Sequence, residues 1–256
     1  MDSPLLPALR ISMSETLATI KANLGAMSRL VFLRHAHSTA NEKGILSGRI
    51  PGITLTQKGV EQSLNLIERL GESNFEQIRV SPLERCALTI EPWLKSQYSQ
   101  GFGLYQIDDN LNEVDYGQWS GRKLSRLSKE TLWKTVQEKP SKVIFPAGEK
   151  MKNVQQRALR SVQESHQHKK TGNFLFVSHG DVIKSVVASL VGLPLDSFQN
   201  LIINPASLTV IDFDGSQGRL LTYSDTTTCI APLLTKKKIG KTLLGGGSGL
   251  PRAGRK

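Results

Sequence analysis

Hydrophobic residues fall into alternating strand-like and helix-like patterns between residues 29 and 190. Short apolar runs bounded by turn residues predict buried strands at 29–33, 75–80, 104–107 and 173–178. Apolar positions spaced three and four residues apart predict helices at 57–70, 82–94, about 123–137, 151–162 and 182–190. This alternation predicts an α/β fold, a three-layer αβα sandwich whose mostly parallel sheet carries helices on both faces.

Three local signals sharpen this pattern. Thr56 is a suitable N-cap for the first long helix, and Gly71 is a suitable residue to end it. Asp214 and Gly215 separate two strand-like runs at 207–213 and 219–223, which predicts a β-hairpin after the last helix.

The positive charge is distributed unevenly along the chain. The formal net charge is +11, but residues 232–256 contain seven basic residues and no acidic one, so residues 1–231 carry only +4. We therefore predict a flexible N-terminal extension at 1–27, one folded domain at 28–231, and a solvated, Gly-rich basic tail at 232–256. The sequence contains no base-reading motif, so no nucleic-acid partner is expected beyond nonspecific contacts of this tail.

Several classes of protein are excluded by the composition. The chain has no run of about 18 apolar residues, so we expect neither a membrane span nor a membrane partner. Cys86 and Cys229 show neither metal-binding spacing nor a disulfide framework, which is typical of a reducing compartment. The first 27 residues lack the charged start and apolar segment of a secretory signal, so we expect a cytoplasmic protein.

Residues capable of phosphate chemistry follow three of the predicted strands. Arg34 and His35 follow the first strand, the segment 81–85 with Arg85 follows the second, and His179 follows the strand at 173–178. Active sites of open α/β sheets gather beyond the carboxyl ends of the strands. Arginine offers paired donors to phosphate oxygens, and histidine serves as a neutral nucleophile or as a cationic donor near neutral pH. These residues therefore predict a pocket for a phosphate dianion.

A leaving alcohol needs a proton, and Glu113 lies beyond the third predicted strand where it could supply one. A carboxyl group beside a bound dianion has a raised pKa, which suits a general acid. Gly180 opens the helix at 182–190, whose N-terminal amides favour an anion. Asp181 is interpreted as a helix cap, and His166 and His168 as solvated residues at a polar helix end.

Four segments resemble the histidine phosphatase (phosphoglycerate-mutase-like) superfamily, in the order found in that family. Residues 32–41 (Phe-Leu-Arg-His-Ala-His-Ser-Thr-Ala-Asn) resemble its Arg-His-Gly signature, and residues 81–89 (Ser-Pro-Leu-Glu-Arg-Cys-Ala-Leu-Thr) its second phosphate-binding motif. Glu113 with residues 116–121 (Tyr-Gly-Gln-Trp-Ser-Gly) is similar to its acid loop, and residues 177–180 (Val-Ser-His-Gly) to its second histidine motif. The resemblance covers residues 29–225 and is strongest to actinobacterial proteins described as phosphatases or phosphomutases.

The resemblance implies a role for each matched residue. His35 would carry the phosphoryl group, Arg34, Arg85 and His179 would hold it, and Glu113 would serve as acid and then base. Asn41 and Ser38 would lie near the phosphate, or serve only as turn residues. Neither a metal nor another cofactor is implied, and the expected partner is a small phosphorylated metabolite.

One residue departs from the family pattern. Ala36 stands where the family usually has glycine, and its methyl group would strain a backbone with positive φ.

Three other functions were weighed against a phosphatase. His35 and His37 form a His-x-His pair that could bind zinc, but Arg34 and Arg85 would repel a divalent cation. A phosphomutase would share the phosphohistidine, yet only 65 residues separate Glu113 from His179, which is shorter than in cofactor-dependent phosphoglycerate mutases. A non-catalytic module that binds phosphorylated ligands is the third alternative.

The organic half of the substrate is not identified by the sequence. We expect its pocket to involve the 42–56 loop and residues 119–150. Two sets of side chains in these segments could contact the substrate. The basic set could equally be ordinary surface charges, and the aromatic set could belong to the core. These are the cations Lys43, Arg49, Arg122 and Lys123, and the aromatic residues Trp119, Trp133 and Phe145. The oligomeric state is not predicted.

Overall fold

A single mixed sheet organises the chain, and a computed structural model describes its residues 27–100 and 104–235. The strand order is β3-β2-β4-β1-β5-β6; the first four strands run parallel, and β5 and β6 are antiparallel to their neighbours. The strands are β1 (Ser28–Arg34), β2 (Gln77–Val80), β3 (Tyr105–Ile107), β4 (Asn173–Ser178), β5 (Leu208–Phe213) and β6 (Gly218–Asp225). Because β2, β4 and β1 are parallel neighbours, their carboxyl ends lie together at one edge.

Each face of the sheet carries its own hydrophobic core. Along β1, Leu30 and Phe32 belong to one core, whereas Val31 and Leu33 belong to the other. This division follows from the alternation of side chains along a strand. A continuous apolar run therefore marks a strand that is covered on both sides, as the sequence predicts.

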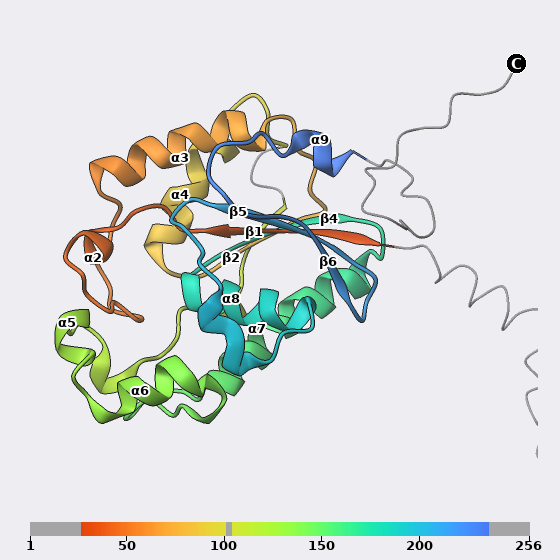
Figure 1. Ribbon diagram of the computed structural model, residues 1–256. Helices are drawn as coiled ribbons and strands as arrows, with labels where there is room; N and C mark the ends of the chain where they lie inside the picture. The colour runs from red at the N-terminus through yellow and green to blue at the C-terminus, as the bar shows by residue number, and fades with distance from the viewer. Residues whose placement is uncertain (1–26, 101–103, 236–256) are drawn as a thin grey trace, which may run out of the picture.

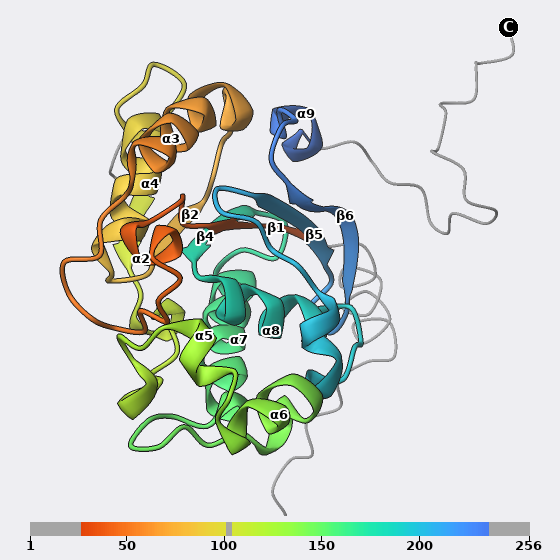
Figure 2. The same cartoon turned by 60° about the vertical axis from the view of Figure 1, so that its left-hand side comes forward.

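Helices cover both faces of the sheet, which confirms the predicted three-layer α/β architecture (Figures 1 and 2). One layer contains α3 (Gln57–Leu70), α4 (Glu84–Leu94) and α9 (Ala231–Leu234); the other contains α7 (Met151–His168) and α8 (Gly180–Leu190). The short helix α2 (Thr39–Glu42) follows β1. Within the described residues, 3-10 segments lie at Asp109–Leu111, Gly117–Trp119, Pro140–Lys142 and Leu195–Asn200.

The predicted boundaries are confirmed where a local signal defines them. Thr56 caps α3 by accepting a hydrogen bond from the amide of Gly59, and Gly71 ends the helix with a φ of 53°. The β5–β6 hairpin turns at Asp214 and Gly215, as predicted, and Gly215 adopts a φ of 100°.

Two helix predictions need correction. The helix expected at 123–137 is two helices, α5 (Leu124–Leu127) and α6 (Thr131–Glu138). The chain turns between them because Leu127 is buried in the core and Glu130 adopts an extended conformation. The helix after β2 begins at Glu84 rather than at Pro82, since the preceding Leu83 is extended.

The predicted terminal segments fall almost entirely outside the described residues. These predictions concern the extension at 1–27 and the basic tail at 232–256, including its nonspecific nucleic-acid contacts. The expected boundary at 231/232 falls inside α9, whose Leu234 packs into a core with 7% exposure. In the part of the chain that the structure describes, no helix is long and apolar enough to cross a membrane.

Candidate active site

The predicted chemical residues converge at the carboxyl edge of the sheet. Arg34 ends β1 and His35 follows it, while His179 follows β4 as the N-cap residue of α8. The imidazole rings of His35 and His179 have centroids 5.3 Å apart and are tilted by 58°. Arg85, in the first turn of α4, places a guanidinium nitrogen 3.2 Å from Nδ1 of His179. The structure therefore brings together residues from three separate segments of the chain.

The hydrogen bonds of His35 define its tautomer. Its Nδ1 lies 2.7 Å from the carbonyl oxygen of Ala36, which can only accept a hydrogen bond. The proton must therefore reside on Nδ1, leaving a lone pair on Nε2. Burial lowers the pKa of His35 well below its ordinary value, and the neighbouring Arg85 and Arg34 lower it further. His35 is thus a neutral imidazole with a nucleophilic nitrogen at neutral pH.

The backbone around His35 is fixed by contacts with other elements. The amide of Ala36 donates to Oγ1 of Thr89 at 2.8 Å, which ties this loop to α4. The amide of Ala206 donates to the carbonyl oxygens of Arg34 and His35, both at 3.2 Å. Within the described residues, the non-glycine positions with positive φ are Ala147, Ala206 and Ser224, so Ala36 carries no such strain.

His179 is fully buried and is held from two sides. Its Nε2 lies 2.7 Å from Oγ of Ser81, and the guanidinium of Arg85 donates to its Nδ1. Because a guanidinium cannot accept a hydrogen bond, the proton of His179 resides on Nε2 and is donated to Ser81. Burial lowers the pKa of His179 well below its ordinary value, assisted by the charge of Arg85. A phosphate dianion would act in the opposite direction and favour the imidazolium form.

Arg85 is a buried cation and Arg34 a half-buried one, and both have spare donors. Arg85 is 1% exposed and donates to the carbonyl oxygen of Gly48, while Arg34 donates to the carbonyl oxygen of Ile203. The Nε atoms of both side chains have no hydrogen-bond partner among the described residues. Buried polar groups are nearly always satisfied, so these donors are suited to an anionic ligand.

Glu113 lies opposite the histidines in the same pocket. Its Oε2 is 3.6 Å from Nδ1 of His179 and 3.9 Å from the Arg85 guanidinium, while Oε1 accepts from the amide of Val114. Burial raises the pKa of Glu113 to about 7, although the charge of Arg85 acts against this rise. From the sequence, we expected a bound phosphate to raise the pKa of Glu113. Burial already raises this pKa in the protein without a ligand.

The two polar residues after His35 occupy different positions. Asn41 lines the pocket, whereas Ser38 is 1% exposed and caps α2. Their side chains form a capping box, in which Oδ1 of Asn41 accepts from the amide and hydroxyl of Ser38 at 3.0 and 2.9 Å. Ser38 thus holds the side chain of Asn41, and direct phosphate contact by either residue stays a prediction.

The interpretations of Asp181 and His166 were wrong. Asp181 does not cap α8, because it is the second residue of that helix; its carboxylate accepts from the Tyr116 hydroxyl and pairs with Lys184. His166 is not solvated, because it is 8% exposed and Nδ1 lies 2.8 Å from the Ser28 hydroxyl.

The metal alternative finds no further support in these side chains. Nδ1 of His37 lies 2.9 Å from Oγ1 of Thr56, at the start of α3. Among residues 27–100 and 104–235, no group of three or more His, Cys, Asp or Glu side chains is arranged to hold a metal ion. Cys86 and Cys229 are both free thiols, the first buried and the second exposed.

Several contributors to the site were missed by the sequence analysis. Arg49 and Arg157 both donate to the backbone carbonyl of Glu113, at 2.9 and 3.1 Å, and so position the acid loop. Ser81 and Tyr116 belong to two of the family-like segments, but the sequence predicts no role for either. Arg157 lies 44 residues beyond Glu113 on α7, and no spacing signal relates the two positions.

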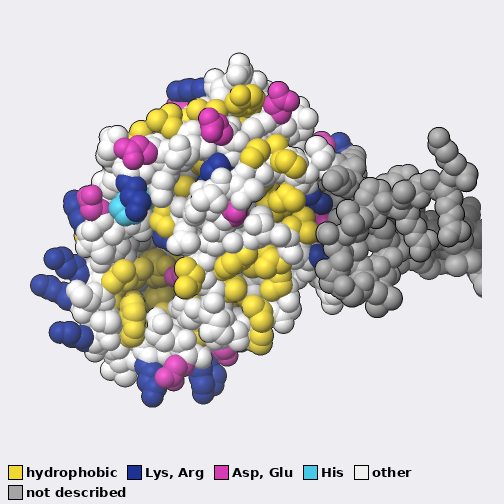
Figure 3. Space-filling model, turned by 45° about the horizontal axis from the view of Figure 1, so that its top comes forward, with side chains coloured by type: hydrophobic (Ala, Val, Ile, Leu, Met, Phe, Trp, Pro, Cys, Tyr) yellow, Lys and Arg dark blue, Asp and Glu magenta, His cyan; other side chains and the backbone are white. Residues whose placement is uncertain are grey.

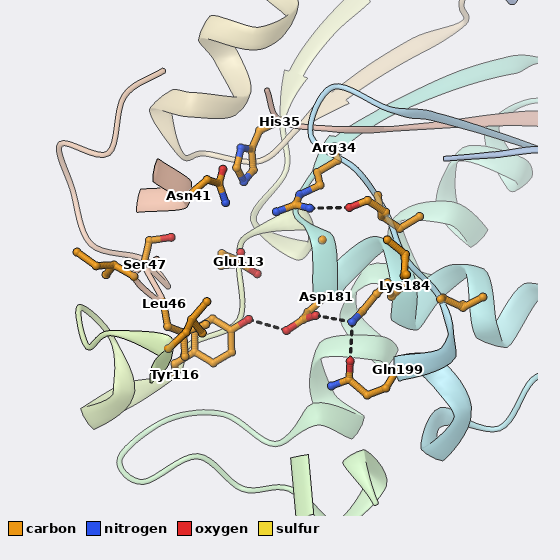
Figure 4. A pocket seen from close by; sticks show the side chains of 16 residues that line it. Arg34, His35, Asn41, Leu46, Ser47, Glu113, Tyr116, Asp181, Lys184 and Gln199 are labelled. Atoms are coloured by element: carbon orange, nitrogen blue, oxygen red, sulfur yellow. Dashed lines mark hydrogen bonds and ion pairs between the residues drawn. The ribbon is translucent and has the colours of Figure 1, made fainter. Parts of the chain in front are cut away.

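A pocket of about 380 Å³ is lined by Arg34, His35, Asn41 and Glu113, among others (Figure 4). Arg34, His35 and Glu113 lie at one end, and Tyr116, Asp181, Lys184 and Gln199 form a hydrogen-bonded row at the other. On the side of the molecule where α2 and α5 lie, the surface is hollowed and bordered by hydrophobic side chains (Figure 3).

Comparisons with known proteins agree on one family. Residues 30–226 match the sequence model of the histidine phosphatase superfamily, branch 1. The chain is 27% identical to phosphoserine phosphatase 1 of Hydrogenobacter thermophilus, covering 76% of this chain and 91% of that protein. It is 26% identical to a 2,3-bisphosphoglycerate-dependent phosphoglycerate mutase of Thermoplasma acidophilum, covering 77% and 92%. The crystal structure of the alpha-ribazole phosphatase of Shigella flexneri superimposes with a TM-score of 0.68 at 27% identity, covering 78% and 98%.

Proposed function

Because the chain belongs to the histidine phosphatase superfamily, we propose that it hydrolyses phosphate monoesters through a phosphohistidine on His35. The observation that carries this proposal is the arrangement of His35, whose free Nε2 is accompanied by the Arg34 guanidinium, a carboxyl of raised pKa, and His179 with its partner Arg85. Its proposed substrate is a small phosphorylated metabolite. The strongest likeness to actinobacterial proteins stays a prediction.

The first step transfers the phosphoryl group to the enzyme. The ester dianion binds between Arg34, Arg85 and His179, and Nε2 of His35 attacks phosphorus. The bond from phosphorus to the ester oxygen breaks, and protonated Glu113 gives its proton to that oxygen. The arginines neutralise the charge on the transferring group, so the scheme uses no metal.

The second step releases phosphate and restores the enzyme. Glu113, now a carboxylate, takes a proton from water, and the water oxygen attacks phosphorus. The bond from phosphorus to Nε2 breaks, and His35 departs as a neutral imidazole. Each catalytic group therefore returns to its starting protonation state.

The decisive experiment compares phosphate release by the full chain and by His35→Ala. We expect the wild type to hydrolyse 4-nitrophenyl phosphate in the presence of EDTA, and His35→Ala to lose roughly three orders of magnitude or more in kcat. His168→Ala, at an exposed position on α7, is the matched control and should keep full activity. If the wild type binds phosphate but hydrolyses no phosphate ester, the protein is a binding module and the proposal is wrong.

A mutase remains the second candidate, because the Thermoplasma acidophilum relative carries that name. The alignment covers 92% of that mutase, so a short chain is compatible with either activity. The length argument from the sequence therefore does not distinguish a mutase from a phosphatase. The same preparation should therefore be incubated with 3-phosphoglycerate. Interconversion with 2-phosphoglycerate and negligible phosphate release would replace hydrolysis as the function.

A further inference from the structure

The lining of this pocket beyond His35 combines hydrophobic side chains with a charged pair. The hydrophobic residues include Leu46, Leu124, Leu201 and Ile202, of which Leu124 is 39% and Ile202 70% exposed. Exposed hydrophobic side chains that gather at a concave site are typical of a surface that contacts an apolar ligand.

The charged part of this lining is an ion pair rather than a free cation. Nζ of Lys184 lies 3.0 Å from Oδ1 of Asp181 and 2.8 Å from Oε1 of Gln199, and it lies 4.4 Å from the ring centre of Phe198. The other oxygen of Asp181 accepts from the Tyr116 hydroxyl at 2.8 Å (Figure 4). The charge of Lys184 is therefore engaged by protein groups before any substrate arrives.

Asp181 keeps a negative charge in this pocket. Burial acts to raise the pKa of Asp181, but Lys184 and the Tyr116 hydroxyl outweigh burial and hold that pKa below its ordinary value. A carboxylate or second phosphate on the leaving group would thus meet an ionised Asp181 in a partly buried pocket. Like charges placed together in such a setting disfavour binding unless a cation compensates them.

Other cations do not provide this compensation. Among the described residues that line the pocket, the basic ones are Arg34, which serves the phosphate end, and Lys184. Arg49 donates to the Glu113 carbonyl and to Glu149, and Arg122 pairs with Glu130. These two cations, which the sequence left open as substrate ligands, hold the acid loop and the α5 region instead.

A second cavity extends the apolar space. It has a volume of about 170 Å³ and shares Leu46, Tyr116, Leu124, Asp181 and Gln199 with the first pocket. Its remaining wall is largely apolar and includes Trp119, Trp133, Phe145 and Phe198. The aromatic residues that the sequence left undecided therefore belong to a core and also border this space.

We propose that this site selects phosphate monoesters of uncharged, largely apolar alcohols, and that Asp181 and Lys184 determine this specificity. Asp181 repels leaving groups that carry a carboxylate or a second phosphate, and Lys184 moderates that repulsion by pairing with Asp181. The inference rests on the proposed phosphatase function, since it concerns the leaving group of that same site.

The test compares two esters of similar reactivity, benzyl phosphate and 4-carboxybenzyl phosphate, by kcat/KM with the full-length protein. We expect the wild type to prefer benzyl phosphate by about tenfold to a hundredfold. Asp181→Asn should reduce this preference by about tenfold, chiefly through a lower KM for the carboxylate ester. Lys184→Met should increase the preference, because it leaves the Asp181 carboxylate unpaired.

The opposite directions of these two changes separate charge selection from structural damage, which would reduce activity on both esters alike. Glu68→Gln, on the exposed face of α3, removes one negative charge elsewhere and should not change the preference. A wild type without preference, or both variants with an unchanged preference, would overturn this inference alone. Failure to hydrolyse either ester would overturn the proposed phosphatase function itself, and the inference with it.

Discussion

His35 and Glu113 have protonation states that suit opposite roles at the same pH. Burial lowers the pKa of His35 and raises the pKa of Glu113 to about 7, since both shifts favour the uncharged form. The protein therefore holds a neutral nucleophile and a neutral acid in one pocket. One low-dielectric environment thus keeps His35 unprotonated as a nucleophile and Glu113 protonated as an acid.

The pH dependence of kcat/KM should show the titration of Glu113. Glu113 is protonated below pH 7, so with benzyl phosphate we expect kcat/KM to fall about tenfold per pH unit above about pH 7. Below about pH 6 the rate should fall again, as the substrate loses its second negative charge. With 4-nitrophenyl phosphate the fall above pH 7 should be much weaker, because nitrophenolate leaves without a proton.

Glu113→Gln provides the control for this assignment. The variant should lose about 10²- to 10⁴-fold in kcat/KM with benzyl phosphate and far less with 4-nitrophenyl phosphate. The fall in kcat/KM above pH 7, which we call the alkaline limb, should disappear in this variant. An alkaline limb that persists in Glu113→Gln would show that another group donates the proton.

The sequence predicted the principal site residues but not the contacts between them. Arg34, His35, Arg85 and His179 were identifiable because each follows a parallel strand, and such strand ends share one edge. Roles for Asp181 and Arg157 could not be predicted, because each depends on a partner 65 or 44 residues away. Only the packed helices bring such pairs together.

At the scale of elements, α3 supports the loop that follows His35. The carbonyl oxygen of His37 accepts from the amide of Thr56 at 3.0 Å, just before the first turn of α3. A Cβ atom added to Gly59 would lie only 2.0 Å from that carbonyl oxygen. Gly59 is therefore required by the close approach of the loop and not by helix propensity.

Gly59→Ala should destabilise the protein, although alanine normally favours a helix by about 1 kcal/mol over glycine. The clash with the His37 carbonyl must displace the loop or the helix, so we expect a net loss of about 1–3 kcal/mol in the free energy of unfolding. Urea denaturation measures this loss, and kcat should fall as well because the loop begins at His35.

Asn65→Ala, at an exposed position of the same helix, is the matched substitution. It should leave both stability and turnover nearly unchanged. A Gly59→Ala variant more stable than wild type would contradict the proposed contact.

Element boundaries were predictable where one residue marks them and not elsewhere. Thr56 and Gly71 define α3 through local hydrogen bonding and backbone conformation, so the sequence contains the information. The break between α5 and α6 has no such marker. It follows from the burial of Leu127, which depends on the rest of the core.

At the scale of the whole molecule, the members of the two hydrophobic cores among the described residues run from Leu30 to Leu234. We therefore propose that residues 27–235 contain the complete catalytic domain. A chain trimmed to 27–235 should keep a Tm within a few degrees of the full chain and kcat/KM within about twofold. Calorimetry and phosphate release measure the two quantities. Aggregation, or a tenfold loss of activity, would show that a trimmed segment contributes to the domain.

The overall architecture was predictable because the alternation of strands and helices is strong. The position of β4 between β2 and β1 was not, since the sequence fixes the order of strands along the chain and not across the sheet. Yet this placement brings His179 between Arg85 and His35. The site thus depends on a long-range pairing that the residue pattern alone does not specify.

The placement of the three tryptophans supplies the protein with its own optical probes. Trp119 and Trp133 stack with ring centres 6.2 Å apart and line the cavity beside the substrate pocket, whereas Trp93 is buried on the opposite face of the sheet. Fluorescence from the stacked pair therefore responds to a ligand entering that cavity. Emission from Trp93 responds to unfolding, so single-tryptophan variants can follow occupancy and melting as separate signals.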